Sequence, residues 1–307
     1  MGDAPRISIV LPTYNGAKYL HEAVQSCLDQ TLADWELIIV DDCSTDQTPA
    51  LAASWTGKDG RISFVRHEVN QKTPGALNTG FARARGGYCT WISDDNRFLP
   101  RAIQEMAEFL DAHPDVGVVY ADYELIDGVG AHCGRMPAGQ VQDLGIECSI
   151  GPCFLYRREV HAKVGGYMLE AWPSDDYEFW LRASCVCRMT PLRRELYQFR
   201  VHPGGMSQAQ AGRVYRAMEG CLKRNLPRLP WMDDEGRAQA YLMMALRARN
   251  WGRPLAAAAH LCRALDCCGP YVLQRAPRWI LADTLLGKAL ANRLRRLLKR
   301  PAAGTEG

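Results

Sequence analysis

The first 125 residues alternate short apolar runs with windows of helical periodicity, and this alternation limits the fold more than any other feature of the sequence. The runs are continuously apolar, as in strands that helices cover on both faces. The windows between them place apolar residues at i, i+3 and i+4 spacing, which indicates amphipathic helices. The pattern therefore predicts a mostly parallel sheet flanked by helices. The expected strands are residues 7–11, 35–40, 62–66, 88–93 and 116–120, and the expected helices end near residues 30, 55, 85 and 113.

Beyond residue 207 the composition shifts to Ala, Leu, Arg and Met at helical spacing. Proline and glycine interrupt this part of the chain, so we expect several separate helices. The predicted helices are residues 208–225, 234–250, 254–267 and 270–298. The sequence thus predicts two domains, an α/β domain over residues 1–207 and a helical appendage over residues 208–307.

Composition and charge exclude several classes of protein. Hydrophobic residues make up 47% and charged residues 23% of the chain, which is ordinary for a folded protein. The net charge of +3 is too small to indicate nucleic-acid binding. The twelve cysteines include no C-x-x-C pair, so a zinc ribbon is not expected. The first residues lack the pattern of a signal peptide and no apolar stretch reaches about 20 residues, so we expect a cytoplasmic protein with reduced thiols.

Pairs of aspartates directly follow two of the expected strands. Asp41 and Asp42 come after the second strand, and Asp94 and Asp95 come after the fourth. In an open α/β sheet, ligands bind beyond the carboxyl ends of the strands, so both pairs are expected to line one cleft. Adjacent carboxylates need neutralisation, and Mg²⁺ or Mn²⁺ would supply it while also binding phosphate oxygens and water. The alternative is a turn or a helix cap that binds no ligand.

Three ordered motifs resemble those of glycosyltransferase family 2. They are SIVLPTYNG at 8–16, LIIVDDCSTD at 37–46 and WISDDN at 91–96, and the resemblance extends over about residues 6–205. Three motifs in order are more specific than any one of them. The resemblance implies a GT-A fold, which is a Rossmann-like, mostly parallel sheet flanked by helices. It also implies an inverting transfer of one sugar from a nucleotide-diphosphate donor to an acceptor hydroxyl, in the synthesis of a bacterial cell-surface polysaccharide or glycoconjugate.

The same resemblance assigns the donor pocket to residues near the strand ends. The residues that it places around the nucleobase and the ribose are Pro12, Thr13 and Tyr14. Asp41 is expected to accept a hydrogen bond from the base, as a carboxylate can from an N–H group. Uracil is the default base, so a UDP-sugar is the expected donor. Lys72 and Asn78 match positions that approach the base or the phosphates, although a solvated surface lysine is the alternative for Lys72.

The metal ligand is expected in Ser93-Asp94-Asp95, where the family has a D-x-D signature. The first position is serine here and brings no carboxylate, so Asp95 is expected to bind Mn²⁺ or Mg²⁺. Asp94 is then a ribose contact or an indirect support of the ion. His202, in the segment RVHPGGMS, matches a histidine that can reach the metal or the diphosphate, and a structural histidine is the alternative.

A catalytic base is expected in SDDYEFWLR at 174–182. An inverting transfer needs one carboxylate that accepts the proton of the acceptor hydroxyl. The match to the family's acidic motif gives this role to Asp176, with Asp175 as the second choice. The alternative is that both residues only cap the helix, because negative charge is favourable at a helix N-terminus.

The C-terminal segment 281–300 is amphipathic and basic. Such a helix can lie on an anionic membrane surface, which would suit a lipid-linked saccharide acceptor and a peripheral location at the inner face of the membrane. Packing on the catalytic domain or in a homo-oligomer is the other interpretation of this segment.

Two other functions fit parts of the sequence. A dinucleotide-binding dehydrogenase or a nucleotidyltransferase would share the sheet, but the first turn, PTYNG at 12–16, lacks the G-x-G-x-x-G fingerprint. A catalytically silent GT-A scaffold would act as a binding module through its helical C-terminus. The intact Asp41, Asp95 and Asp176 favour the enzyme.

Overall fold

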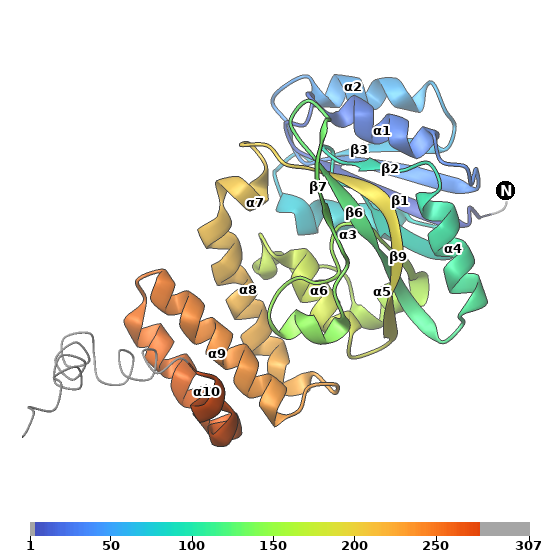
Figure 1. Cartoon of the computed structure of the whole chain (residues 1–307). Coiled ribbons are helices and arrows are strands. Elements are labelled where there is room, and N and C mark those ends of the chain that lie inside the picture. The colour runs from blue at the N-terminus through green and yellow to red at the C-terminus, as the bar shows by residue number, and fades with distance from the viewer. Residues whose placement is uncertain (1–3, 277–307) are drawn as a thin grey trace, which may run out of the picture. The chain divides into compact units, whose positions relative to one another are not determined.

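The computed structural model of the chain describes residues 4–276. The chain divides into two compact units, one ending at Leu229 and the other beginning at Pro230. The first unit is α/β and the second is helical (Figure 1). In chain order, the first unit contains β1 (Ile7–Thr13), α1 (Leu20–Leu28), β2 (Trp35–Asp41), α2 (Thr48–Thr56), β3 (Ile62–Arg66), α3 (Lys72–Arg83), β4 (Tyr88–Trp91), β5 (Arg97–Phe98), α4 (Ala102–Ala112), β6 (Val116–Ile126), β7 (His132–Met136), η1 (Val141–Gly145), β8 (Phe154–Arg157), α5 (Arg158–Val164), η2 (Leu169–Ala171), α6 (Asp175–Ala183), β9 (Arg188–Arg200), α7 (Met206–Ala209), α8 (Ala211–Asn225) and η3 (Leu226–Arg228). The second unit contains α9 (Asp234–Asn250) and α10 (Pro254–Arg275).

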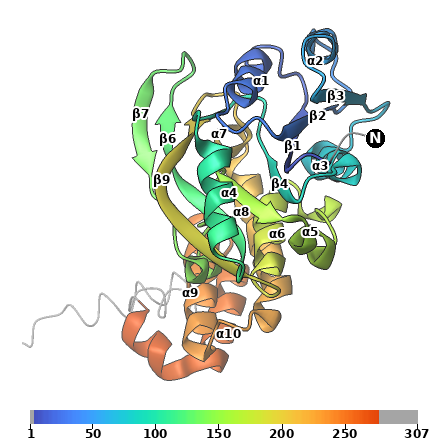
Figure 2. The ribbon, with the colours of Figure 1, turned by 90° about the vertical axis from the view of Figure 1, so that its right-hand side faces the viewer.

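One sheet runs through the first unit in the order β3-β2-β1-β4-β8-β6-β9-β5, with β7 paired to β6. Strands β1 to β4 are parallel, and the strand order reverses at β1, which lies between β2 and β4. Beyond β4 the sheet is mixed, because β8 runs antiparallel to both β4 and β6 while β9 runs parallel to β6. Figure 2 shows β6 and β9 as long curved strands, with the short β7 beside β6. The predicted α/β class with flanking helices is confirmed, and a crevice is expected where the strand order reverses.

The alternation of side chains along β1 decides which helices cover which face. Ile7, Ile9 and Leu11 are fully buried on one face, in a core that they share with α1 and α4. Val10 points to the opposite face, where α3 packs so closely that a side chain at Gly80 would overlap it. Both faces of the first strands are therefore covered, as their continuously apolar sequences predict.

A second group of buried rings fixes α6 against α3 and β8. The rings of Tyr167 and Phe179 stack with their centres 4.5 Å apart, and Phe81 of α3 stacks on Tyr167 at 5.9 Å. Trp180 contacts Phe154 of β8 edge to face at 4.6 Å. Such aromatic pairs contribute about 0.5–1.5 kcal/mol each beyond the area that they bury. They hold the start of α6, which carries the predicted base, at a defined place on the sheet.

The observed boundary between the units differs from the predicted boundary at 207/208. Helix α8 belongs to the first unit, because contacts attach it to the segment before α6. Ser174 Oγ donates to the carbonyl oxygen of Val214 at 3.0 Å, and the guanidinium of Arg213 lies 4.1 Å from the ring centre of Trp172. In the second unit, α10 bends at Cys268, just before Pro270, where the sequence predicts a break between two helices. The assignment of residues 208–307 to acceptor, membrane-surface or oligomer contact stays a prediction.

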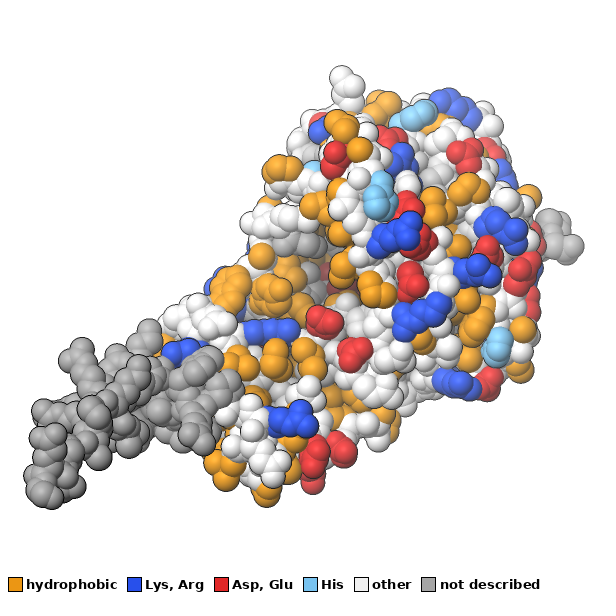
Figure 3. All heavy atoms as spheres, in the orientation of Figure 1, with side chains coloured by type: hydrophobic (Ala, Val, Ile, Leu, Met, Phe, Trp, Pro, Cys, Tyr) orange, Lys and Arg blue, Asp and Glu red, His pale blue; other side chains and the backbone are white. Residues whose placement is uncertain are grey.

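Within residues 4–276, no helix is both long enough and apolar enough to span a membrane. All twelve cysteines lie in this part of the chain and are free thiols. On the face shown in Figure 3, acidic and basic side chains are interspersed over the first unit, in agreement with the small net charge. The basic amphipathic segment 281–300 lies outside the described residues.

Candidate active site

The carboxyl ends of β1, β2 and β4 meet, as the two aspartate pairs predict. The backbone N–H of Asp42 donates to the carbonyl oxygen of Thr13 at 2.8 Å. Thr13 Oγ1 donates to Asp94 Oδ2 at 2.5 Å. A Cβ atom at Gly16 would overlap the Asp94 carboxylate and lie 2.6 Å from Thr13 Oγ1. The loops after β1 and β4 therefore approach so closely that only glycine fits between them.

Backbone strain is concentrated in the loops that follow β1, β2 and β3. Among the described residues, the non-glycine residues with positive φ are Asn15 (53°) after β1, Cys43 (66°) after β2 and Lys72 (65°), the first residue of α3. This conformation is uncommon for residues with a side chain, and it persists where surrounding contacts impose it. The contacts here include Asn15 N–H to Ser44 Oγ at 2.8 Å and Thr45 N–H to Asn15 Oδ1 at 2.9 Å. Strained loops of this kind are typical of binding sites.

The two aspartates after β2 have different partners. Asp41 is fully buried, and Arg66 Nε lies 3.1 Å from its Oδ2 atom. Asp42 Oδ1 accepts the backbone N–H of Gln71 at 2.7 Å and lies 2.8 Å from His67 Nδ1. Asp42 therefore shapes the loop that leads into α3. The contact of Asp41 with a nucleobase stays a prediction.

The residues predicted around the base and ribose lie at the end of β1. Pro12 is half-buried and Thr13 is buried in the strand, whereas the side chain of Tyr14 is 52% exposed. An exposed aromatic ring beside a strained loop has a face on which a base can stack.

Asp95 and His202 lie together although they are 107 positions apart in the chain. His202 Nε2 is 3.1 Å from Asp95 Oδ2. The ring of His202 also meets the ring of Tyr19 edge to face, with centres 5.2 Å apart. Burial, followed by the neighbouring charge of Asp95, raises the pKa of Asp94 to about 7, while the Thr13 hydroxyl opposes this shift. A concentrated negative charge at this strand end is thus only partly neutralised by the protein itself.

The described residues contain no group of three or more His, Cys, Asp or Glu side chains placed to hold a metal ion. Asp95 and His202 together offer two ligands. Mg²⁺ and Mn²⁺ commonly take only one or two protein ligands and complete their coordination with phosphate oxygens and water. This donor set therefore fits an ion that binds together with a diphosphate, and it does not fit an ion enclosed by protein alone.

The predicted base lies in the first turn of α6. Asp175 is buried, with 5% of its surface exposed, whereas Asp176 is partly exposed. Burial, followed by the charge of Asp176, raises the pKa of Asp175 to about 8, so this carboxyl is largely protonated at neutral pH. Burial also raises the pKa of Asp176, and the N–H of Tyr177, which donates to Asp176 Oδ1 at 2.7 Å, opposes that shift. Of the two carboxylates, Asp176 is thus better suited to accept a proton.

A contact with α3 ties the segment before this second carboxylate pair to the start of that helix. Lys72 Nζ, at the start of α3, lies 5.3 Å from the ring centre of Trp172, four residues before Asp176. Arg213 of α8 lies over the same ring. Two cations on one indole make the rim of the site between α3, η2 and α8 basic.

Both polar atoms of the Asn78 side chain form hydrogen bonds with the backbone of Tyr167. Its Nδ2 donates to the carbonyl oxygen of Tyr167, and its Oδ1 accepts the N–H of Tyr167, both at 2.8 Å. This pair of bonds ties the turn after α5 to α3. The predicted contact of Asn78 with the base or the phosphates stays a prediction.

Arg200, whose Nε donates to the carbonyl oxygen of Asp95 at 2.8 Å, is a residue of the site that no sequence motif singles out. Its side chain is fully buried, whereas arginine is normally exposed. No local pattern marks a charged residue as buried, because burial depends on partners elsewhere in the chain. The only available signal is its place two residues before His202.

The model of the family described as Glycosyl transferase family 2 matches residues 8–165, which carry β1 to α5. The chain belongs to glycosyl transferase family 2. An uncharacterized glycosyltransferase of Rickettsia prowazekii is 39% identical over 126 residues, which are 40% of this chain and 38% of the relative. The putative glycosyltransferase EpsE of Bacillus subtilis is 27% identical over 189 residues, 59% of this chain and 68% of EpsE. The putative teichuronic acid biosynthesis glycosyltransferase TuaG of Bacillus subtilis is 36% identical over 106 residues, 34% of this chain and 42% of TuaG. The chain spans 26% to 38% of the length of the first curated relatives that it matches.

Solved members of the GT-A class share the fold. TarS 1–349 of S. aureus in complex with UDP matches with a TM-score of 0.67 and 17% identity, over 98% of this chain and 94% of that chain. The mannosyltransferase PcManGT of Pyrobaculum calidifontis, in complex with GDP-Man and Mn²⁺, matches with a TM-score of 0.54 and 19% identity, over 96% of this chain and 83% of that chain. This family 2 protein therefore has the GT-A fold that its motifs predict.

Proposed function

We propose that the chain is an inverting glycosyltransferase that transfers one sugar from a nucleotide-diphosphate-sugar, with UDP as the favoured nucleotide, to an acceptor hydroxyl. The observation that carries the proposal is the Asp95–His202 pair, which lies at the carboxyl ends of the parallel strands. The solved complexes of TarS with UDP and of PcManGT with GDP-Man support a nucleotide-sugar donor. The name of TuaG, a putative teichuronic acid biosynthesis glycosyltransferase, supports a role in the synthesis of a cell-surface polysaccharide.

In this proposal, Asp95 and His202 hold Mn²⁺ or Mg²⁺ together with the donor diphosphate. The ion would supply positive charge to the diphosphate as it departs. Pro12, Thr13 and Tyr14 bind the base and ribose, with Asp41 and Asp94 as acceptors for their N–H and hydroxyl groups. The basic rim formed by Lys72 and Arg213 adds charge that favours an anionic group of the substrates.

Asp176 acts as the general base. As the acceptor oxygen attacks the anomeric carbon, its proton moves to the Asp176 carboxylate, the new C–O bond forms, and the bond from that carbon to the diphosphate oxygen breaks. Attack from the face opposite the diphosphate inverts the configuration. A pKa raised by burial makes Asp176 a stronger base than an ordinary aspartate.

The proposed acceptor is a saccharide or a lipid-linked saccharide, and the proposed location is cytoplasmic, at the inner face of the membrane for a lipid-linked acceptor. The helical appendage would then contact the acceptor, the membrane surface or a second copy of the chain. The saccharide acceptor rests on the sequence resemblance and on the name of TuaG, whereas the location and the role of the appendage rest on the sequence alone.

Thermal-shift and donor-hydrolysis assays with UDP-, GDP- and dTDP-sugars test the proposal. We expect one class of donor to raise the melting temperature and to be hydrolysed slowly in Mn²⁺, with both effects lost in excess EDTA. Equal shifts in Mn²⁺ and in EDTA would contradict the metal assignment. No shift and no hydrolysis with any donor would favour the catalytically silent scaffold.

A further inference from the structure

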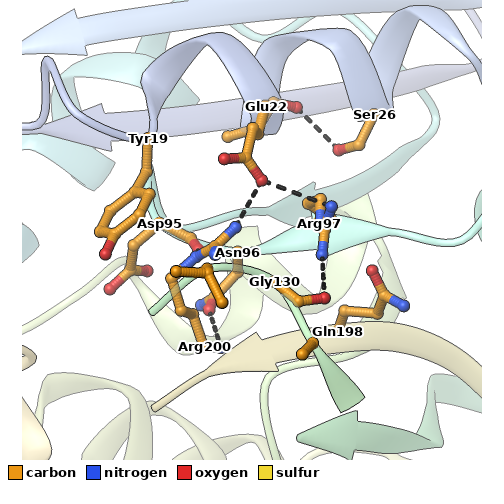
Figure 4. Close-up of polar contacts among 12 residues, drawn as sticks. Tyr19, Glu22, Ser26, Asp95, Asn96, Arg97, Gly130, Gln198 and Arg200 are labelled. Atoms are coloured by element: carbon orange, nitrogen blue, oxygen red, sulfur yellow. Dashed lines mark hydrogen bonds and ion pairs between the residues drawn. The ribbon is translucent and has the colours of Figure 1, made fainter. Parts of the chain in front are cut away.

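Arg200, the last residue of β9, has a fully buried side chain whose donors are all directed into the protein (Figure 4). Its Nη2 donates to Glu22 Oε2 of α1 at 2.5 Å. Its Nε donates to the carbonyl oxygen of Asp95 at 2.8 Å, and its Nη1 donates to that of Asp127 at 3.2 Å. One guanidinium thus joins α1, the turn after β4 and the loop between β6 and β7.

A second hydrogen bond joins the same two segments, this time from the backbone of Arg200 to a side chain of the turn. The backbone N–H of Arg200 donates to Asn96 Oδ1 at 2.8 Å, and Asn96 is 1% exposed. The side chain of Arg200 therefore holds the backbone of the Asp95 turn, while the side chain of Asn96 holds the backbone of Arg200. This reciprocal pair fixes the end of β9 against the turn that carries Asp95. His202 follows only two residues later.

The ring of Tyr19 extends this network to His202. The guanidinium of Arg200 lies 4.3 Å from the ring centre of Tyr19, and the ring of His202 meets the same ring at 5.2 Å. The hydroxyl of Tyr19 donates to the carbonyl oxygen of Gly128 at 3.1 Å. Arg200 thus lies against the backbone of one of the two predicted metal ligands and against a ring that supports the other.

Only arginine can make these contacts at once. Its planar fork presents five N–H donors, whereas a lysine ammonium is a compact charge that cannot reach three separate acceptors in this geometry.

A buried ion pair is weak evidence for stability, because desolvation offsets its attraction. Glu22 also pairs with Arg97 at 3.4 Å. The three side chains Arg200, Arg97 and Glu22 together therefore carry a net positive charge beside Asp95. The network is therefore better explained by the geometry that it imposes than by the stability that it adds.

We propose that Arg200 is a positioning residue of the metal centre, which holds Asp95 and His202 so that both can bind one ion. It touches neither substrate nor ion, and it acts through the backbone of Asp95 and the ring of Tyr19. This inference rests on the proposed function, because it assumes that Asp95 and His202 are metal ligands.

The test compares Arg200→Lys with Arg157→Lys in the full chain. Arg157 is a matched control because it also donates to backbone carbonyls, from Nε to Val116 at 2.9 Å and from Nη2 to Leu110 at 2.6 Å, but it lies where β8 meets α5, away from Asp95 and His202. Free Mn²⁺ is measured by electron paramagnetic resonance during titration of each protein in saturating UDP, and circular dichroism confirms folding. Arg200→Lys should weaken Mn²⁺ binding by about 10-fold or more, as changes behind a metal ligand do. Arg157→Lys should stay within about twofold of wild type, although both variants lower the melting temperature.

The outcomes separate this inference from the proposed function. Wild-type protein that binds Mn²⁺ with UDP, together with an Arg200→Lys variant that binds it as tightly as Arg157→Lys does, would overturn the positioning role alone. Wild-type protein that binds no Mn²⁺ in the presence of UDP, GDP or dTDP would overturn the metal assignment and the positioning role with it. A milder variant, Glu22→Gln, keeps an acceptor for Arg200 and should weaken Mn²⁺ binding less than Arg200→Lys does.

Discussion

Asp95 and Asp176, the two carboxylates on which the proposed reaction depends, are held by different kinds of contact. Asp95 lies in the turn between β4 and β5, and its neighbours Arg200 and His202 come from more than a hundred positions away. Asp176 lies in the first turn of α6 and accepts the N–H of the next residue, Tyr177. The Asp95 side chain thus depends directly on contacts from distant parts of the chain, whereas the Asp176 carboxylate is held by a local bond, on a helix that tertiary packing places. A substitution at Asp176 should therefore abolish sugar transfer and leave donor binding intact. A substitution in the turn that carries Asp95 should weaken both.

The largest effect is expected from Asp176→Asn. The amide keeps the size of the side chain but cannot accept the proton of the acceptor hydroxyl, so kcat should fall by about 10³-fold. Donor-induced thermal stabilisation in Mn²⁺ should stay at the wild-type level. Initial rates of transfer and thermal shifts measure the two effects. Glu170→Gln is the control, because it also replaces a carboxyl group by an amide, at an exposed site nearby, and it should be neutral. Loss of donor binding together with loss of rate would show that the two sides are not separable.

Asp95→Ala should reduce kcat/KM by about 10²-fold, because one ligand of the proposed ion and its charge are lost from the diphosphate site. In contrast to Asp176→Asn, it should also abolish the part of the donor-induced thermal shift that requires Mn²⁺. Asp29→Ala, at an exposed position of the same residue type, should behave as wild type. A metal-dependent shift that survives in Asp95→Ala would place the ion elsewhere.

Gly16→Ala tests the close approach of the loops on the metal side. The added methyl group would overlap the Asp94 carboxylate, so the turn that carries Asp94 and Asp95 must move. We expect KM for the donor to rise by about 10-fold, since small displacements of substrate-binding groups are costly. Gly57→Ala is the control, because a Cβ atom there meets no atom within 4 Å. Steady-state kinetics with donor as the varied substrate decide the point, and equal KM values for both variants would contradict the close approach.

The smallest expected effect is a pH dependence of protein stability that comes from Asp175, next to the proposed base. The pKa of Asp175, raised by burial to about 8, lies above its ordinary value of 3.8, so the folded protein holds this proton more tightly than the unfolded chain. The stabilisation from Asp175 is therefore complete below about pH 4 and is lost as the pH rises through 8. Asp175→Asn cannot ionise, so its melting temperature should exceed that of wild type by a few degrees more at pH 8.5 than at pH 5. Melting curves of this variant and of Asp29→Asn across that range would show it, and parallel curves for the two variants would refute it.

The regular part of the site was predictable because its signals are local. The strands ending at Thr13, Asp41 and Trp91 are short apolar runs, and the acidic residues after them follow from the rule that ligands bind at the carboxyl ends of parallel strands. Their meeting point is confirmed by the contact between Thr13 and Asp94. Local patterns of this kind need no knowledge of the rest of the chain.

The remaining features depend on contacts that no local pattern encodes. Strand β9 carries several arginines and is only half-buried, so its sequence does not read as a central strand, yet it pairs along most of β6. The burial of Arg200 requires Glu22 and Asn96, which lie far from it in sequence. The predicted boundary at 207/208 follows the change in composition, whereas α8 joins the first unit through contacts with Ser174 and Trp172. Each difference reflects tertiary packing that overrides a local preference.

The left-handed backbone at Asn15, Cys43 and Lys72 has a consequence for engineering this protein. At Cys43 and Lys72 this conformation costs about 1 kcal/mol relative to glycine, so selection for thermostability would favour glycine there. Asn15 tolerates the conformation better, and its Oδ1 atom accepts the N–H of Thr45. The gain would be made in the loops that shape the candidate nucleotide pocket, and glycine would also loosen them. A heat-tolerant descendant of this chain should therefore bind its donor less tightly, and directed evolution aimed at stability alone would do better to leave these three loops untouched.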